Sequence, residues 1–60
     1  MKRKHSKIID ELGGTKAVAE LLGVSQGAVS QYRHRGIPRH WLMYLAVKYP
    51  DIGTRYRIYG

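Results

Sequence analysis

The side chains best suited to chemistry in this chain are cationic, and their distribution favours binding to phosphate. Eleven of the 60 residues are Lys or Arg and four are Asp or Glu, which gives a formal net charge of +7. No acidic residue occurs between Leu21 and Pro50. The same stretch contains Arg33, Arg35 and Arg39. A basic surface gains free energy on a nucleic acid because it releases counterions condensed on the phosphates. We therefore expect a polyanionic partner, with these three arginines as contacts to its backbone.

The other polar residues do not form a pattern typical of catalysis or of metal binding. The chain has no cysteine, so it can form neither a disulfide nor a thiolate metal site. His5, His34 and His40 lack the spacing of zinc ligands. The four acids are scattered rather than paired, and no serine has a His and Asp arrangement around it. We expect no enzyme activity, no metal, no cofactor and no small-molecule substrate.

The apolar content predicts a soluble cytoplasmic protein without a membrane partner. The longest apolar run covers residues 41–47, which is far shorter than a membrane-spanning helix. Asp10 and Glu11 follow the basic N-terminus closely and exclude the apolar region of a signal peptide.

Capping residues and apolar spacing predict a single all-α domain over residues 1–60, with four short helices and a tail. Ser6, Thr15 and Ser25 are the expected N-terminal caps. Pro38 suits a first helical turn because its missing N–H would be unpaired there. Residues 54–59 alternate apolar and basic side chains, so the tail is expected to be extended or partly ordered, and a single strand is possible. The predicted helices cover residues 7–12, 16–22, 26–34 and 39–49, and the tail covers residues 50–60.

The stretch from Thr15 to Tyr32 is the most informative part of the chain. Two short helices that meet at a steep angle need a small residue where they cross, and Ala19 supplies one. The tight turn between them needs a positive φ, which Gly23 adopts at little steric cost. Apolar side chains must then face inward from both helices. The residues placed to do so are Val18, Leu22, Val24, Val29 and Tyr32.

This stretch resembles the helix-turn-helix of the phage Cro and CI repressors, which have a lambda-repressor-like fold. The resemblance is carried by Ala19, Gly23, Val24 and Val29, and by the sequences LGVS and AVSQY, which are especially similar to Cro-like proteins of lambdoid phages. It covers about residues 7–45. In that family the second helix of the motif lies in the major groove of DNA. The resemblance implies sequence-specific binding to double-stranded operator DNA in a bacterial host cell, and repression by exclusion of polymerase from the promoter.

The resemblance also implies roles for single residues. It places base-reading positions at Gln26, Gly27, Ser30 and Gln31. It places backbone contacts at Thr15, Lys16 and Ser25, of which Ser25 could also meet a base. A glutamine amide can pair with N6 and N7 of adenine. The glycine either allows a close approach of the helix to DNA or simply avoids a clash.

We expect a homodimer on a palindromic operator, with half-sites about 34 Å apart, because one short helix reads too few base pairs for useful specificity. The predicted helix over residues 39–49 has more apolar surface than a core of this size needs. The candidate dimer contacts are Met43, Tyr44 and Val47 on that helix and Tyr56 and Ile58 in the tail.

Two other functions remain open. An RNA-binding or ribosome-associated module would explain the positive charge, but not the register of Ala19, Gly23 and Val29. A membrane-active cationic peptide usually forms one continuous amphipathic helix, whereas glycines and Pro38 divide this chain.

Overall fold

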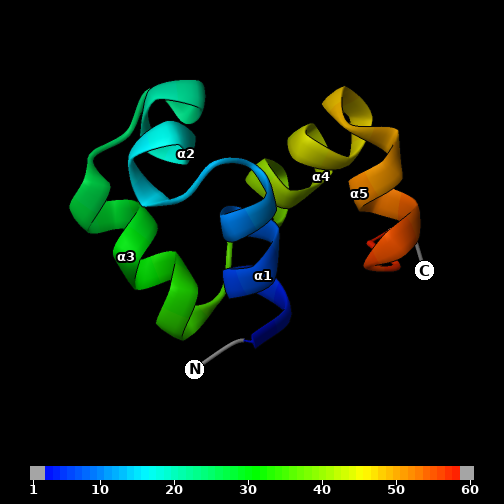
Figure 1. The fold of residues 1–60 in the computed structure, drawn as a ribbon, viewed down its shortest axis with the longest axis horizontal. Coiled ribbons are helices and arrows are strands. Elements are labelled where there is room, and N and C mark those ends of the chain that lie inside the picture. Colours follow the sequence, from blue (N-terminus) through cyan, green and yellow to red (C-terminus); the bar gives the residue numbers. More distant parts are fainter. Residues whose placement is uncertain (1–2, 59–60) are drawn as a thin grey trace.

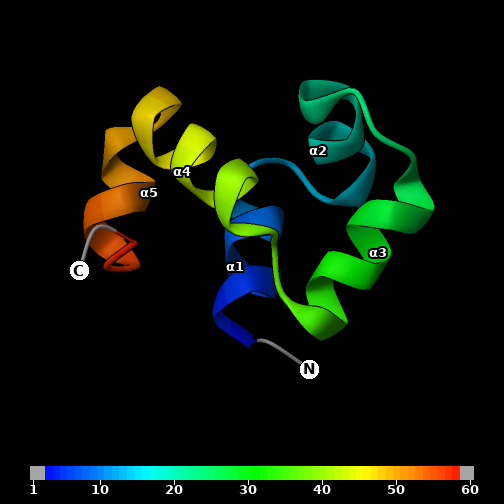
Figure 2. The same ribbon diagram turned by 180° about the vertical axis from the view of Figure 1, so that it is seen from behind.

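A computed structural model describes residues 3–58 of the chain. These residues form five α-helices joined by short turns, and they contain no strand. Helix α1 lies in the middle, with α2 and α3 on one side of it and α4 and α5 on the other (Figure 1), and the view from behind shows the same arrangement (Figure 2). The helices are α1 (Arg3–Glu11), α2 (Thr15–Leu22), α3 (Gln26–Arg35), α4 (Arg39–Lys48) and α5 (Pro50–Arg55).

The all-helical class is confirmed, but residues 3–58 form five helices rather than the four predicted, and the prediction of an extended or partly ordered tail is wrong for residues 50–58. Pro50 occupies the first turn of α5, where its missing N–H costs nothing, and Asp51 follows it in the same turn. Beyond the helix, the Ile58 N–H donates to the Gly53 carbonyl oxygen at 2.9 Å. This segment therefore folds back as a helix and a turn rather than as a strand. Residues 59 and 60, which the tail prediction also included, lie outside the described range.

One of the three predicted caps is confirmed. The Ser25 Oγ accepts the Ala28 N–H at 3.1 Å and so satisfies a donor in the first turn of α3. Ser6 instead lies inside α1, which begins at Arg3, and Thr15 is the first residue of α2 rather than its cap. Both of these hydroxyl groups bind Arg33 from α3, as described below.

The turn between α2 and α3 has the backbone that the sequence predicts. Gly23 adopts φ 70° and ψ 31°, which is the left-handed conformation. The N–H of the next residue, Val24, donates to the Ala19 carbonyl oxygen at 3.0 Å, which closes the end of α2. Three residues separate the two helices, so α2 and α3 are held against each other through a short and specific connection.

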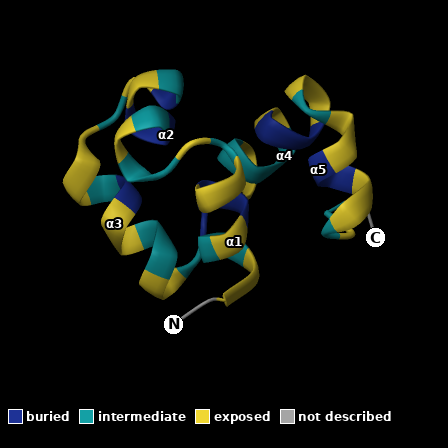
Figure 3. Cartoon of the chain, in the orientation of Figure 1, coloured by how far each residue is buried: buried dark blue, intermediate teal, exposed yellow. Residues whose placement is uncertain are grey.

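The core lies where the helices meet α1. Ile8, Ile9 and Val29 are fully buried, as is Leu45 from α4 (Figure 3). The inward positions predicted on α2 and α3 agree with the structure, since Val18, Leu22 and Val29 are buried and Val24 and Tyr32 are partly buried against the same cluster. None of the helices within residues 3–58 is long and apolar enough to cross a lipid bilayer.

Replacing Gly13 by alanine should destabilise the fold by about 1–3 kcal/mol, because its φ of 111° strains a side chain. A Cβ at this position would also lie 2.9 Å from the Ala17 Cβ, which is too close for two carbon atoms. The midpoint temperature of thermal unfolding should fall by at least about 4 °C. The control is Gly27→Ala, since Gly27 is helical and has room for a methyl group. Equal midpoints for the two variants would contradict the prediction.

Candidate nucleic-acid interface

The outward face of α3 carries small and neutral polar residues. Its core-facing side is defined by Val29, which is fully buried, and by Tyr32, which packs against the core. With 3.6 residues per turn, the opposite side of this helix points away from the protein. The four predicted base-reading positions, Gln26, Gly27, Ser30 and Gln31, are all exposed there.

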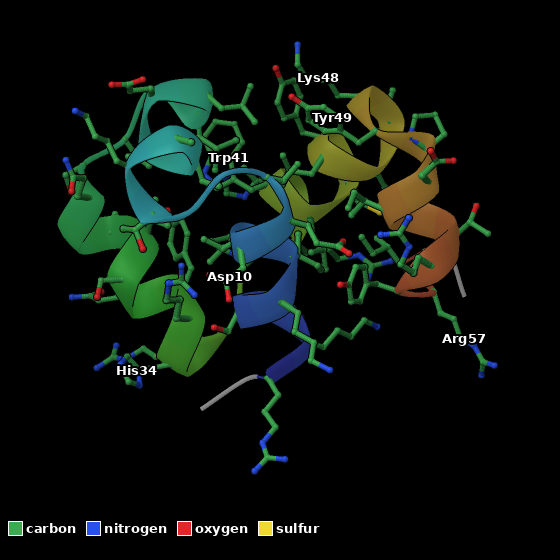
Figure 4. The ribbon with its side chains drawn as sticks, in the orientation of Figure 1. Asp10, His34, Trp41, Lys48, Tyr49 and Arg57 are labelled. Carbon is green, nitrogen blue, oxygen red and sulfur yellow. The ribbon has the colours of Figure 1, made fainter. Side chains whose placement is uncertain are left out.

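The same face continues to His34, which the sequence reading did not include among the base-reading positions. Gly27, Ser30, Gln31 and His34 follow the i, i+3, i+4, i+7 spacing of one helical stripe. His34 is exposed, and Figure 4 shows its side chain pointing away from the rest of the molecule. Helical periodicity alone could have identified this residue. The outward stripe of α3, defined as Gln26, Gly27, Ser30, Gln31 and His34, contains no acidic residue.

Arg33 has a different role from the phosphate contact that its charge and position suggest. Its Nη1 donates to the Ser6 Oγ at 2.8 Å and to the Ser6 carbonyl oxygen at 3.3 Å. Its Nε donates to the Thr15 Oγ1 at 3.0 Å, and its Nη2 lies 2.8 Å from the Asp10 Oδ1 in an ion pair. Figure 4 shows Asp10 on the side of α1 that faces α3. All three guanidinium nitrogens are thus engaged within the fold, and Arg33 ties α3 to α1 and α2.

The other predicted backbone contacts lie on the surface, with one exception. Lys16, Arg35 and Arg39 are exposed, and within the described range none of their side chains makes a hydrogen bond or an ion pair. Ser25 is exposed at the start of α3, where it caps the helix. Thr15 is only partly exposed, and its hydroxyl oxygen accepts from Arg33. The cations that remain available therefore lie at the start of α2, at the end of α3 and at the start of α4.

The fold also brings the basic start of the chain against the end of α3, which the sequence could not show. The Ile37 N–H donates to the His5 Nδ1 at 2.6 Å, and Ser6 binds Arg33. These contacts hold the first turns of α1 beside the segment that follows α3 (Figure 1). The exposed cations on these turns are Arg3, Lys4 and Lys7.

Two of the four acids are neutralised within the fold. Asp10 pairs with Arg33, and Glu11 pairs with Arg55 through an oxygen to nitrogen distance of 2.6 Å. Partial burial of the phenol and the nearby Glu11 carboxylate raise the pKa of Tyr56 above its ordinary value. These pairs lie on the body of the molecule rather than on the outward stripe of α3. The other two acids, Glu20 on α2 and Asp51 on α5, are exposed and also lie outside that stripe.

The candidate dimer contacts divide into two groups. Tyr44 and Val47 on α4 are 41% and 70% exposed, and Met43 on the same helix is partly buried. Tyr56 and Ile58 are partly buried and pack against the core of their own chain, so only part of each side chain is open to a second copy. Both residues lie in the turn that follows α5.

A shallow hollow lies at the corner between α4 and α5 and the end of α1, away from α3. Its lining includes Glu11, Lys48, Asp51 and Arg55, and this mixture of charges favours no single class of ionic ligand. Among residues 3–58 no three His, Asp or Glu side chains gather in a way that could hold a metal ion.

Comparisons with known proteins return no match, whether to a family model, to a curated protein or to a solved structure. What the chain does must therefore be inferred from its own residues.

Proposed function

We propose that the chain binds double-stranded DNA in a sequence-specific manner, with α2 and α3 as a helix-turn-helix and α3 in the major groove. The observation that carries this proposal is the outward stripe of α3, which is exposed, free of carboxylates and rich in amide and hydroxyl groups. The major groove is about 12 Å wide and admits an α-helix. A helix that presented only cations would hold phosphates without reading bases, whereas neutral donors and acceptors can distinguish base edges.

The exposed cations around this stripe fit the role of phosphate contacts. Lys16 lies in the first turn of α2, the helix expected to cross the DNA backbone. Arg35 is the last residue of α3, and Arg39 is the first residue of α4. The basic first turns of α1 extend the positive surface beside the end of α3. Such contacts position the protein on DNA and supply affinity that falls with salt, while the stripe supplies specificity.

The chain is proposed to act as a repressor, which is the function of the Cro and CI proteins that residues 7–45 resemble. Repression in this manner needs occupancy of promoter DNA and no further chemistry. A dimer on a palindromic operator would double the number of base pairs read. The exposed part of α4, with Val47 and Tyr44, is the proposed contact between the two copies.

Selection of binding sites from a random DNA pool tests the proposed function. We expect the pool to converge on a short motif that includes an A·T pair, because the amide of Gln26 is exposed at the start of α3 and pairs best with adenine. A parallel selection from structured and single-stranded RNA pools tests the RNA-binding alternative. A pool that stays random after several rounds, or convergence of the RNA pool alone, would contradict the proposal.

Replacing Val47 by glutamate should reduce binding to a palindromic duplex to the level of a single half-site. The side chain is 70% exposed, so the variant should retain its fold to within about 0.5 kcal/mol. Sedimentation of the protein with the selected duplex measures the stoichiometry. Thr54→Glu is the control, because it makes the same change of charge at an exposed position on α5. If the wild-type protein binds the palindrome as one copy per duplex, the dimer proposal is wrong.

A further inference from the structure

Gly27 occupies a place on α3 where the fold itself does not require a glycine. Its backbone is helical and it is exposed. A Cβ built on it would meet the Ser25 Oγ at 3.8 Å, which is an ordinary contact, with nothing closer outside the adjoining backbone. Alanine would therefore fit without strain. Glycine is a poorer helix former than alanine, so the protein keeps the less favourable residue in the first turn of α3.

The other described glycines differ from Gly27 because the fold accounts for them. Gly53 is buried in α5 and so, unlike Gly27, does not lie on the surface. The remaining four lie at the ends of helices with positive φ, which other residues rarely adopt. They are Gly13, Gly14, Gly23 and Gly36.

The position of Gly27 within the outward stripe of α3 suggests what the missing side chain allows. Gly27 lies one turn before Ser30 and Gln31 on the same stripe, and Gln26 is its neighbour in the chain. The helix backbone is thus bare at a point that polar side chains surround. Any surface that these side chains touch can come closer to α3 at Gly27 than at the neighbouring positions.

We infer that Gly27 determines specificity by letting the backbone of the first turns of α3 approach the floor of the major groove. This inference rests on the proposed function and deepens it, because it names the point of closest contact with the bases. A methyl group at this position would hold the helix away from the groove. The amides of Gln26 and Gln31 would then lose their contact with base edges, while longer and flexible cationic side chains would still reach phosphates.

The test is Gly27→Ala, for which we expect opposite effects on stability and on DNA binding. The unfolding midpoint should rise by about 2–8 °C, because alanine favours the helix. The dissociation constant for the selected duplex should rise by about 5- to 100-fold, as expected for an overpacked contact. The dissociation constant for a scrambled duplex should stay within about twofold, since phosphate contacts carry non-specific binding.

Thr54→Ala is the matched control, because it also places alanine at an exposed helical position, on α5 and far from α3 (Figure 2). It should raise the unfolding midpoint and leave both dissociation constants unchanged. If Gly27→Ala binds the selected duplex as tightly as the wild type, or unfolds at a lower temperature, the inference is wrong and the proposed function stands. If the wild type itself does not distinguish the two duplexes, the proposed function is wrong and the inference fails with it.

A second measurement identifies the group on DNA that lies against Gly27. Each thymine of the selected duplex is replaced in turn by deoxyuridine, which removes a methyl group from the major groove. Recovery of Gly27→Ala binding at one position supports the inference and assigns the contact to that thymine methyl. If no replacement relieves the loss, the group against Gly27 is not a thymine methyl. Equal weakening of the selected and the scrambled duplex by Gly27→Ala would then assign the contact to the sugar-phosphate backbone and overturn the inference.

Discussion

Replacing Arg33 by alanine should destabilise the domain by about 2–4 kcal/mol, because the substitution removes a partly buried guanidinium together with its charge-assisted hydrogen bonds. The Arg33 side chain is 20% exposed and contacts Ser6, Asp10 and Thr15. It therefore joins α3 to α1 and to α2. Asp10 is 65% exposed, and solvent screening keeps the ion pair itself among the smaller contributions. A domain of 60 residues has a free energy of unfolding of roughly 3–9 kcal/mol. The variant should thus lose much of its stability.

Urea titration at low temperature measures this loss, with Arg35→Ala as the control. Arg35 lies two residues further along α3 and is exposed, and its side chain makes no hydrogen bond within residues 3–58. Its replacement makes the same change of charge and should alter stability by at most about 0.5 kcal/mol. Arg33→Lys should fall between the two, because lysine keeps the charge but lacks the planar set of donors. Equal stability of Arg33→Ala and Arg35→Ala would show that the contacts of Arg33 do not stabilise the fold.

Replacing Gln26 by alanine should weaken binding to the selected duplex by about 1–3 kcal/mol for each half-site, because a bidentate contact with adenine is lost. On a palindrome that binds two copies, the loss is about 2–6 kcal/mol, or roughly 30- to 20,000-fold in affinity. The fold should be unaffected, since Gln26 is exposed and its side chain makes no hydrogen bond to any of residues 3–58. A second selection with the variant should show that preference is lost at a single position of each half-site.

Lys16→Ala is the matched control for this loss. Lys16 is also exposed, at the start of α2, but carries a charge rather than an amide. Removal of the Lys16 charge should weaken binding to all duplexes alike. It should also reduce the slope of the logarithm of affinity against the logarithm of salt concentration by about one unit for each bound copy. If Gln26→Ala weakens selected and scrambled duplexes equally, Gln26 does not read a base.

The parts of the fold that depend on residues close together in the sequence could be predicted from it. The cap at Ser25, the left-handed turn at Gly23 and the inward face with Val29 follow from local chemistry and helical periodicity, and all three agree with the structure. The outward face of α3 follows from the same periodicity, since the residues that do not face the core must face away from it.

Helix α5 was missed because the local preferences in and after it conflict with a helix. Gly53 weakens a helix from within, and Tyr56 and Ile58, which follow the helix, favour strands. The helix forms because Ile52 and Gly53 are buried when α5 packs against α4, and this gain is not visible from sequence spacing. The start signal was nevertheless present, since a proline followed by an acidic residue is typical of a first helical turn.

The role of Arg33 could not be predicted from the sequence, because its partners lie 18 to 27 residues earlier in the chain. Charge alone placed it with Arg35 and Arg39, whereas only tertiary structure separates the arginine that stabilises the fold from those on the surface. The same holds for the basic turns of α1, which reach the end of α3 through the contact between His5 and Ile37.

The most direct test of sequence-specific reading by α3 is the ratio of affinities for a selected and a scrambled duplex, measured at several salt concentrations. We expect both affinities to fall with salt at similar slopes, because the same cations contact phosphates in both complexes. Their ratio should stay at about a thousandfold or more, since contacts with bases depend little on counterion release. A ratio near one at every salt concentration, in a protein that unfolds cooperatively, would show that positive charge alone holds the DNA.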